Sequence, residues 1–300
     1  MDVDATLVFF GNERLVSGLP HTDAPVLRAL IDAGYTIKAV VSHHTDGKSR
    51  NNRDLEVADV AAKHNIPVLL PAKPIDIYDQ LVEMKADAAV LVAYGKIIPQ
   101  KIIDIFPRGI INIHPSLLPK YRGPTPIESA IENGDLETGV SIMQLSAGMD
   151  EGPVYAQQKI ELGGYETKLD LYKKIADISA QLLIETLPLI LDERILPKEQ
   201  HHEKATYSKL FDKADARLDP ATIDAGAAER RVRAHAGFPK TKLTVLGHDI
   251  IITKAHVAHE VLTPLDVRCH GGAVLSIDEL VAPSGKTMSA QAFLNGYAAA

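Results

Sequence analysis

Short apolar runs alternate with amphipathic stretches through the first half of the chain. Residues 88–93 form a continuous apolar run, which is typical of a central parallel strand covered on both faces. The intervening stretches repeat apolar positions at helical spacing. The pattern predicts strands at residues 6–10, 36–41, 66–70, 88–93 and 109–113, and helices at residues 24–33, 55–64 and 75–85.

This alternation predicts an α/β fold with a Rossmann-like, doubly wound parallel sheet, in which ligands bind beyond the carboxyl ends of the strands. Two helix starts carry capping signals. Asp54 is expected to be the N-cap of the second helix. Thr125 and Glu128 are expected to form a capping box around Pro126, in a helix that Gly134 ends.

The chain changes character after a long amphipathic helix, predicted at residues 167–191 with a kink or break at Pro188. Two strands precede this helix, at residues 140–145 and 154–161. Short β-rich pieces follow it at residues 242–246, 250–255 and 273–280, and they predict a small OB-like β-barrel. We therefore expect a catalytic domain over residues 1–195, a linker over 196–207 and a carboxy-terminal domain over 208–300.

The composition is that of a globular protein: 300 residues, of which 46% are hydrophobic and 24% charged. The single Cys269 excludes an internal disulfide and fits a reducing compartment. No apolar run approaches the ~20 residues that span a bilayer, and the start MDVD lacks the basic region of a secretory signal. We expect a cytoplasmic monomer with no membrane partner.

The formal net charge of −7 argues against a protein coated in nucleic acid. The charge is uneven, because residues 205–300 carry 11 basic and 10 acidic side chains, against 21 and 29 in the remainder. A near-neutral tail on an acidic body is compatible with a modest RNA contact surface.

Candidate catalytic residues lie where the predicted strand at residues 109–113 ends. Asn112 and His114 lie two positions apart, so their side chains share one face of the strand. Asp150, between two glycines, follows the next predicted strand. Asn, His and Asp at the ends of different strands are a recurrent basis for acid–base chemistry.

The motifs resemble those of the folate-dependent formyltransferases. NIHPSLLPKYRG at residues 112–123 and TGVSIMQLSAGMDEG at 138–152 carry the resemblance first. ATYSK at 205–209, RVRA at 231–234 and PSGKTMSAQAFLNG at 283–296 extend it over nearly the whole chain. The resemblance implies formyl transfer from 10-formyltetrahydrofolate to the methionine amine of initiator methionyl-tRNA.

The resemblance assigns Asn112, His114 and Asp150 to catalysis. Acyl transfer to an amine needs a donor to the tetrahedral oxyanion, a proton-transfer group and a carboxylate that orients that group. Asn112 can supply the donor, His114 can also donate and carry a proton near pH 7, and Asp150 can hold the imidazole. No metal is expected, because the paired histidines lack further ligands at metal-site spacing.

The resemblance also implies contacts to the reduced folate. The segment Ser116, Leu117, Leu118 and Pro119 is one, with a turn carrying two core leucines as the alternative. The second, LVAYGKIIP at residues 91–99, offers backbone groups to the pterin edge. Its expected contact residues are Val92, Tyr94, Gly95 and Ile97.

Contacts to tRNA are implied for Lys48, Arg50 and Arg53, in the polar loop at residues 42–54, and for Arg122, Arg231 and Arg233. The alternatives are a solvated connection for the loop, a local salt bridge for Arg122, and a solvated helix face for the basic cluster at residues 230–233.

The chain departs from the family after its first strand, where FGNERLVSG at residues 10–18 replaces a Gly-Thr-Pro-x-Phe turn. This segment is not a GxGxxG turn, and no Walker string occurs, so no nucleotide cofactor is expected. Three rival functions stay open: an N-formyltransferase for an amino sugar nucleotide, a formyltetrahydrofolate hydrolase, and a silent folate- or RNA-binding protein. The complete Asn, His and Asp set argues against the last.

Overall fold

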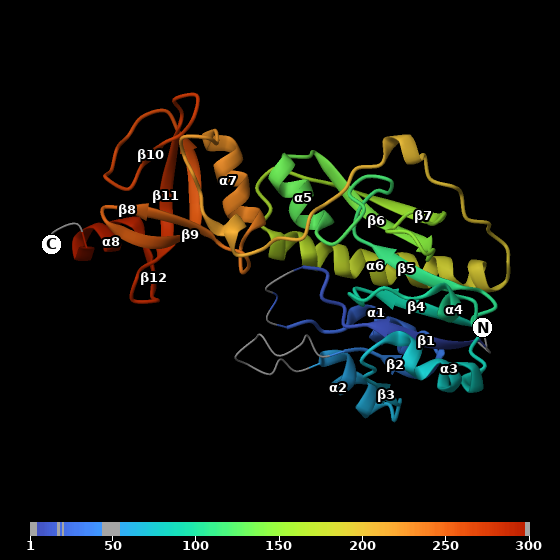
Figure 1. Cartoon of the computed structure of the whole chain (residues 1–300). Helices are drawn as coiled ribbons and strands as arrows, with labels where there is room; N and C mark the ends of the chain where they lie inside the picture. Colours follow the sequence, from blue (N-terminus) through green and yellow to red (C-terminus); the bar gives the residue numbers. More distant parts are fainter. Residues whose placement is uncertain (1–4, 17–18, 20, 44–54, 298–300) are drawn as a thin grey trace.

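The computed structural model describes residues 5–16, 19, 21–43 and 55–297. A seven-stranded sheet with helices on both faces forms the first part, and a separate antiparallel sheet lies at the other end of the molecule (Figure 1). This confirms the predicted fold class. The strands of the first sheet are β1 (Thr6–Gly11), β2 (Thr36–Val41), β3 (Val68–Leu69), β4 (Ala88–Val92), β5 (Ile110–His114), β6 (Glu137–Gln144) and β7 (Val154–Glu161).

The strand order of this sheet is β3-β2-β1-β4-β5-β6-β7. Neighbours from β3 to β5 run parallel, whereas β6 and β7 are antiparallel additions at one edge. Because β6 runs antiparallel, its last residue Gln144 lies opposite Ile111 near the start of β5. The loop that follows β6 reaches back to the segment after β5, where the Asp150 carboxylate accepts the N–H of Gly123. The edge of the sheet where ligands are expected therefore receives residues from both segments.

Alternation along β1 builds two cores, one on each face of the sheet. Leu7 and Phe9 join one cluster, whereas Val8 and Phe10 join the other. The first cluster includes residues of α1 (Pro25–Asp32), α2 (Glu56–Lys63), α5 (Pro126–Asn133) and α6 (Lys168–Leu191), and the second includes residues of α3 (Tyr78–Met84) and α4 (Gln100–Ile103).

Three predicted helix features are corrected. Helix α2 has Leu55 at its N-cap with no side-chain cap, and Asp54 lies outside the described residues. The Thr125 hydroxyl donates to the carbonyl of Lys209 and does not close a capping box. Helix α6 runs through Pro188 to Leu191 without the predicted break, since a proline one turn from the helix end removes few backbone bonds.

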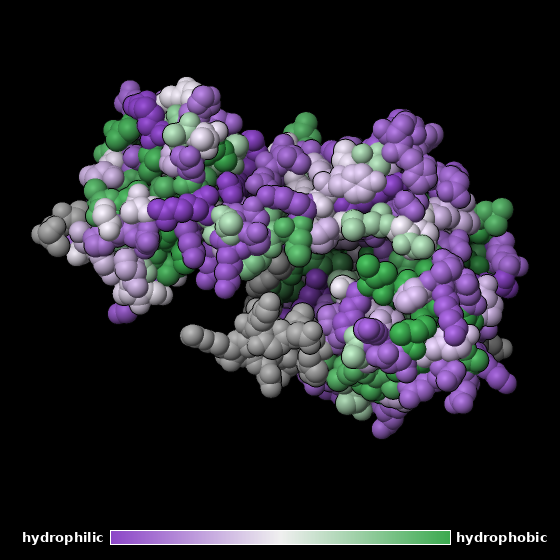
Figure 2. Space-filling model, in the orientation of Figure 1, coloured by the Kyte–Doolittle hydropathy of each residue, from purple (hydrophilic) through white to green (hydrophobic). Residues whose placement is uncertain are grey.

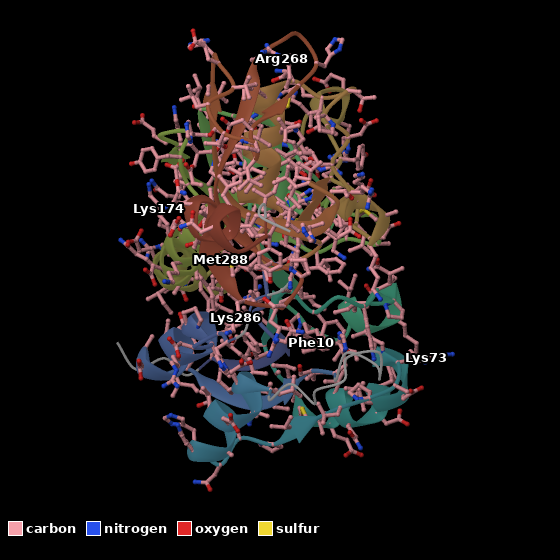
Figure 3. All side chains as sticks on the ribbon, turned by 90° about the vertical axis from the view of Figure 1, so that its left-hand side faces the viewer. Phe10, Lys73, Lys174, Arg268, Lys286 and Met288 are labelled. Carbon is pink, nitrogen blue, oxygen red and sulfur yellow. The ribbon has the colours of Figure 1, made fainter. Side chains whose placement is uncertain are left out.

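The second sheet pairs β11 (Val274–Val281) with β9 (His248–Ala258) on one side. On its other side β11 pairs first with β10 (Val267–Arg268) and then with β12 (Thr287–Ser289). Arg268 and Met288 accordingly lie toward opposite ends of this sheet (Figure 3). The remaining elements are β8 (Thr241–Val245), which pairs with β9, and the helices α7 (Ala225–Ala234) and α8 (Ala290–Tyr297).

Helix α7 joins the two parts of the molecule, because it packs on the second core and also lies beside α5 (Figure 1). Polar contacts cross this junction. Arg230 Nε donates to the carbonyl of Glu132 at 3.1 Å, and Arg233 Nη1 donates to that of Glu166 at 2.8 Å. The Lys168 ammonium, fully buried, donates to the carbonyl of Phe238 at 2.7 Å.

Candidate active site

A cavity of about 640 Å³ lies beyond the carboxyl ends of β4 and β5. Figure 2 shows that one face of the molecule is hollowed, with hydrophobic side chains exposed there. Asn112, His114 and Asp150 all line the cavity, so the structure brings the three predicted catalytic residues together. The other lining residues are Arg14, Leu15, Leu91, Ala93, Tyr94, Gly95, Lys96, Ile97, Ile98, Ile113, Pro115, Gly123, Pro124, Pro126, Leu145, Ser146, Ala147, Gly148 and Met149.

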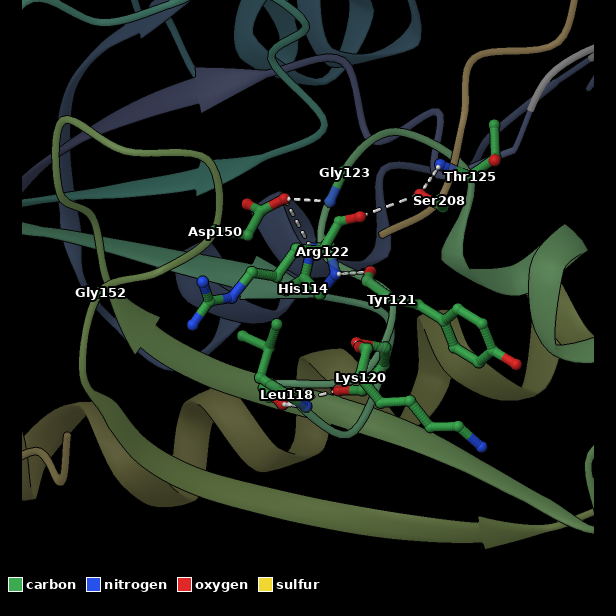
Figure 4. Close-up of polar contacts among 12 residues, drawn as sticks. His114, Leu118, Lys120, Tyr121, Arg122, Gly123, Thr125, Asp150, Gly152 and Ser208 are labelled. Carbon is green, nitrogen blue, oxygen red and sulfur yellow. Dashed lines mark hydrogen bonds and ion pairs between the residues drawn. The ribbon is translucent and has the colours of Figure 1, made fainter. Parts of the chain in front are cut away.

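His114 is buried, and its two ring nitrogens have different partners (Figure 4). Nε2 lies 2.9 Å from the carbonyl oxygen of Tyr121. A carbonyl can only accept, so Nε2 carries a hydrogen. Nδ1 faces the Asp150 carboxylate, 3.6 Å from Oδ2, which is an ion-pair distance longer than a hydrogen bond.

Asp150 is held by the backbone around it. Its Oδ2 atom accepts the N–H of Gly123 at 2.8 Å. Its own φ angle is +48°, in the left-handed region that residues other than glycine rarely adopt. The neighbouring side chain of Asn112 lines the cavity and makes no hydrogen bond to any other described residue, so its amide is available to a bound molecule.

The segment predicted to contact the pterin lies partly at the cavity, and its role stays a prediction. Tyr94, Gly95 and Ile97 line the cavity, whereas Val92 is buried in the sheet core. The His43 Nε2 atom donates to the carbonyl of Tyr94 at 2.6 Å and fixes that backbone. Burial raises the pKa of the Tyr94 hydroxyl to about 12, so this group stays protonated at neutral pH.

The segment from Ser116 to Pro119 does not line the cavity. The Ser141 hydroxyl on β6 donates to the carbonyl of Ser116 at 2.6 Å and accepts the N–H of Leu118 at 3.1 Å. Leu118 is buried, and Leu117 packs against Gly139 of β6. The turn folds back on the sheet with Leu118 buried and Leu117 partly buried, and the expected folate contact of Ser116, Leu117, Leu118 and Pro119 stays a prediction.

The guanidinium of Arg122 is also internal, with 1% of the residue exposed. It donates to the Gln200 Oε1 atom from Nε at 3.2 Å and from Nη2 at 2.8 Å, and further to His202 and Tyr207. These partners are neutral or weakly basic. The prediction of an anion contact by Arg122 does not fit this geometry, and neither does the alternative of a local salt bridge.

The other predicted tRNA contacts divide into two groups. Lys48, Arg50 and Arg53 lie outside the described residues. Arg233 pairs with Glu229 on its own helix at 2.6 Å, and Arg231 donates to the carbonyl of Asp215. Both arginines of α7 are partly buried and engaged within the protein, Arg231 with its own part of the molecule and Arg233 also with the carbonyl of Glu166 in the first part.

Two residues near the site carried no interpretable signal in the sequence. Arg14 lines the cavity from the unusual segment after β1 and pairs with Glu56 at 3.0 Å. Gln200 lies in the stretch predicted to be a linker, and its side-chain amide donates to the carbonyls of Asp150 and Gly152 at 2.9 and 2.7 Å. A lone glutamine in a polar stretch has no spacing that predicts such contacts.

Within the described ranges, no helix combines the length and the apolar character that crossing a bilayer requires. Over the same ranges, no three His, Cys, Asp or Glu side chains come together in an arrangement suited to a metal ion.

Residues 14–187 match the family model described as formyl transferase. Methionyl-tRNA formyltransferase from Methylococcus capsulatus is 35% identical over 303 residues, covering 95% of this chain and 96% of that protein. The enzyme of the same name from Roseobacter denitrificans is 35% identical over 297 residues, with the same coverage of both chains.

Solved structures share the fold at lower identity. A variant of HypX from Aquifex aeolicus superimposes with a TM-score of 0.67 at 17% identity, over 97% of this chain and 49% of that one. A sugar N-formyltransferase from Shewanella sp FDAARGOS_354 superimposes with a TM-score of 0.64 at 17% identity, over 86% of this chain and 99% of that one.

Proposed function

The chain belongs to the formyl transferase family, and within it to the methionyl-tRNA formyltransferases, and from this membership we propose its reaction. It transfers a formyl group from 10-formyltetrahydrofolate to the amino group of methionine on initiator methionyl-tRNA. The observation that carries the proposal is the convergence of Asn112, His114 and Asp150 on one cavity at the carboxyl edge of the sheet.

The three side chains meet the needs of acyl transfer to an amine. Asn112 donates its side-chain N–H to the oxyanion that forms on the formyl group. His114 exchanges a proton through Nδ1, because Nε2 is occupied by the carbonyl of Tyr121. The carboxylate of Asp150, 3.6 Å from Nδ1, stabilises the imidazolium form that the proton transfer creates.

The cavity also suits a reduced folate as formyl donor. Its volume of about 640 Å³ is within the range of ligand pockets, and its wall combines apolar side chains with a few polar groups. Tyr94, Gly95 and Ile97 would hold the donor along the backbone of their loop. The bound folate supplies a formyl group already activated on nitrogen.

The carboxy-terminal part supports tRNA over a sugar nucleotide as acceptor. The named tRNA enzymes match this chain at 35% identity over 95% of its length, so the match extends into residues 208–300. The sugar enzyme shares the fold alone. We propose the division into a catalytic domain over residues 1–195, a connecting segment and a tRNA-contacting domain over 208–300, in a monomer that acts in the cytoplasm.

The decisive experiment is an acceptor comparison with the purified protein. It is incubated with 10-formyltetrahydrofolate and either initiator methionyl-tRNA, elongator methionyl-tRNA, an amino sugar nucleotide or buffer. Formylation is expected on the initiator tRNA and much less on the elongator. Formylation of the sugar nucleotide alone, or release of formate in buffer at the same rate, would overturn the proposal.

A further inference from the structure

Residues 198–209, here called the strap, are bound along the catalytic segment and do not hang free as a linker. Lys198 exchanges two backbone hydrogen bonds with Val154, each 2.8 Å long. Arg122 N–H donates to the carbonyl of Thr206 at 2.9 Å, and Ser208 N–H donates to that of Arg122 at 2.8 Å. The strap therefore forms a bridge beside the segment that precedes Gly123, as Figure 4 shows for Ser208.

Gln200 is the point where the strap reaches the catalytic loop. The residue is 7% exposed, and its side-chain oxygen accepts two hydrogen bonds from the guanidinium of Arg122. Its side-chain nitrogen donates to the carbonyls of Asp150 and Gly152. The amide thus joins the segment before Gly123 to the loop that contains Asp150.

These bonds act on both ends of Asp150. Gln200 donates a hydrogen bond to the backbone carbonyl of Asp150. The backbone of Asp150 is left-handed, a conformation that a residue with a Cβ keeps only when its surroundings impose it. The carboxylate is held from the other side by the N–H of Gly123, which directly follows Arg122. A rotation of either segment would move Oδ2 relative to the His114 Nδ1 atom.

We propose that Gln200 and Arg122 are positioning residues that set the Asp150 carboxylate against His114, so that the strap is part of the active site. The inference rests on the proposed formyl transfer for its kinetic consequence, but its structural claim concerns the protein without substrate. The two roles of the Gln200 side chain explain why a buried guanidinium is paired with a neutral amide. A carboxylate in that place could accept from Arg122 but could not donate to the two carbonyls.

The test replaces Gln200 in two ways. Gln200→Glu keeps an oxygen acceptor for Arg122 but loses the donors to the two carbonyls, and Gln200→Leu loses both functions at similar size. We expect kcat to fall roughly 10²-fold in each, as for a displaced catalytic group, with the KM values for folate and acceptor within about threefold of wild type. Gln181→Glu, on the exposed face of α6, adds the same charge and should keep wild-type kinetics.

A second readout needs no substrate. The amide proton of Gly123 donates to the Asp150 carboxylate, so its NMR shift should move upfield and its exchange should quicken in both Gln200 variants, but not in Gln181→Glu. A folded Gln200→Glu protein with unchanged kcat, or with only KM raised, would overturn the positioning role, as would an unmoved Gly123 signal. If wild type formylates no acceptor, the proposed function fails, while the Gly123 signal still decides this inference.

Discussion

The partners of the two His114 ring nitrogens determine which nitrogen is available to exchange a proton. Nε2 is committed to the carbonyl of Tyr121, and Nδ1 points to Asp150 and the cavity. The strand period places Asn112 on the same face, so that an amide, an imidazole and a carboxylate surround one space. In the proposed formyl transfer, these groups would supply the oxyanion donor and the proton carrier.

Replacing Asn112, His114 or Asp150 singly by Ala should lower kcat/KM by roughly 10²–10⁴-fold, the range for lost proton transfer or oxyanion donors. The losses should not multiply, because the three side chains act as one unit. Steady-state kinetics of the single and double variants provide the measurement, with thermal unfolding as the control for folding. A double variant whose loss equals the product of the two single losses would contradict the arrangement.

Glu13 offers a prediction about stability rather than catalysis. Its carboxylate is buried and accepts the N–H groups of Val26 and Leu27 at the start of α1. Burial outweighs these donors and raises the pKa of Glu13 from 4.5 to about 7. Between these two pH values the folded state binds more protons than the unfolded state. The contribution of Glu13 to the free energy of unfolding is therefore complete below pH 4.5 and is lost as pH rises through 7.

Glu13→Gln removes that titration. Relative to wild type, the free energy of unfolding of the variant should rise with pH, by an amount on the order of 2 kcal/mol between pH 5.5 and pH 8. Urea unfolding at the two pH values measures the difference, in which the other titrating groups cancel. Parallel pH profiles for the two proteins would show that Glu13 does not titrate as described.

The positions of site residues were predictable from the sequence where a local pattern determines them. Period two along β5 places Asn112 and His114 together, and glycines around Asp150 mark its turn. The internal contacts of Arg122 could not be predicted in this way, because its partner Gln200 is 78 residues away and no spacing links them. The position of the segment from Ser116 to Pro119 was not predictable for a related reason: it depends on Ser141 of β6.

At the scale of elements, apolar periodicity predicted most strands and helices because burial on a sheet face requires it. It could not predict that β6 and β7 turn antiparallel, since the pattern does not encode strand direction. The predicted capping box at Thr125 does not form, and the reason lies in the tertiary packing of Glu128. Glu128 is fully buried and faces Lys168 of α6 at 3.7 Å, where a helix-cap carboxylate would be exposed.

The Lys168–Glu128 pair between α5 and α6 should be costly to break on one side only. Burial lowers the pKa of Lys168, and the carboxylate of Glu128 opposes this shift. Lys168→Met should destabilise the protein by about 3–5 kcal/mol, because it removes the ammonium that faces the buried carboxylate of Glu128. Denaturant unfolding should show much of that loss restored when Glu128→Leu is added. A double variant as unstable as Lys168→Met would mean that packing, not charge, causes the loss.

At the scale of the molecule, helix α7 and the strap both connect the two parts. Helix α7 contacts the first part through Arg230 and Arg233, and the strap binds beside the catalytic segment before the chain enters the second part. The sequence predicted a linker there because a polar stretch without a period is typical of one. The backbone hydrogen bonds of this stretch to residues 119–123 could not be predicted from the sequence, since almost every residue type offers the same backbone groups.

Two truncations separate the strap from the carboxy-terminal domain. A chain ending at residue 213 keeps the strap and loses the second sheet, whereas one ending at residue 197 loses both. The longer protein should keep the KM for folate near that of the full chain, while its KM for methionyl-tRNA rises. Its binding of tRNA should also depend less on salt, because phosphate contacts that release counterions are removed.

The shorter protein should lose kcat as well, since Asp150 and Gly152 no longer receive the hydrogen bonds of Gln200. Circular dichroism and thermal unfolding of both truncations provide the control for folding. Equal kcat in two folded truncations would make the strap a passive connection. An unchanged KM for tRNA in the longer one would place the whole tRNA site on the first part of the molecule, and the contribution of residues 214–300 would then have to be sought in stability.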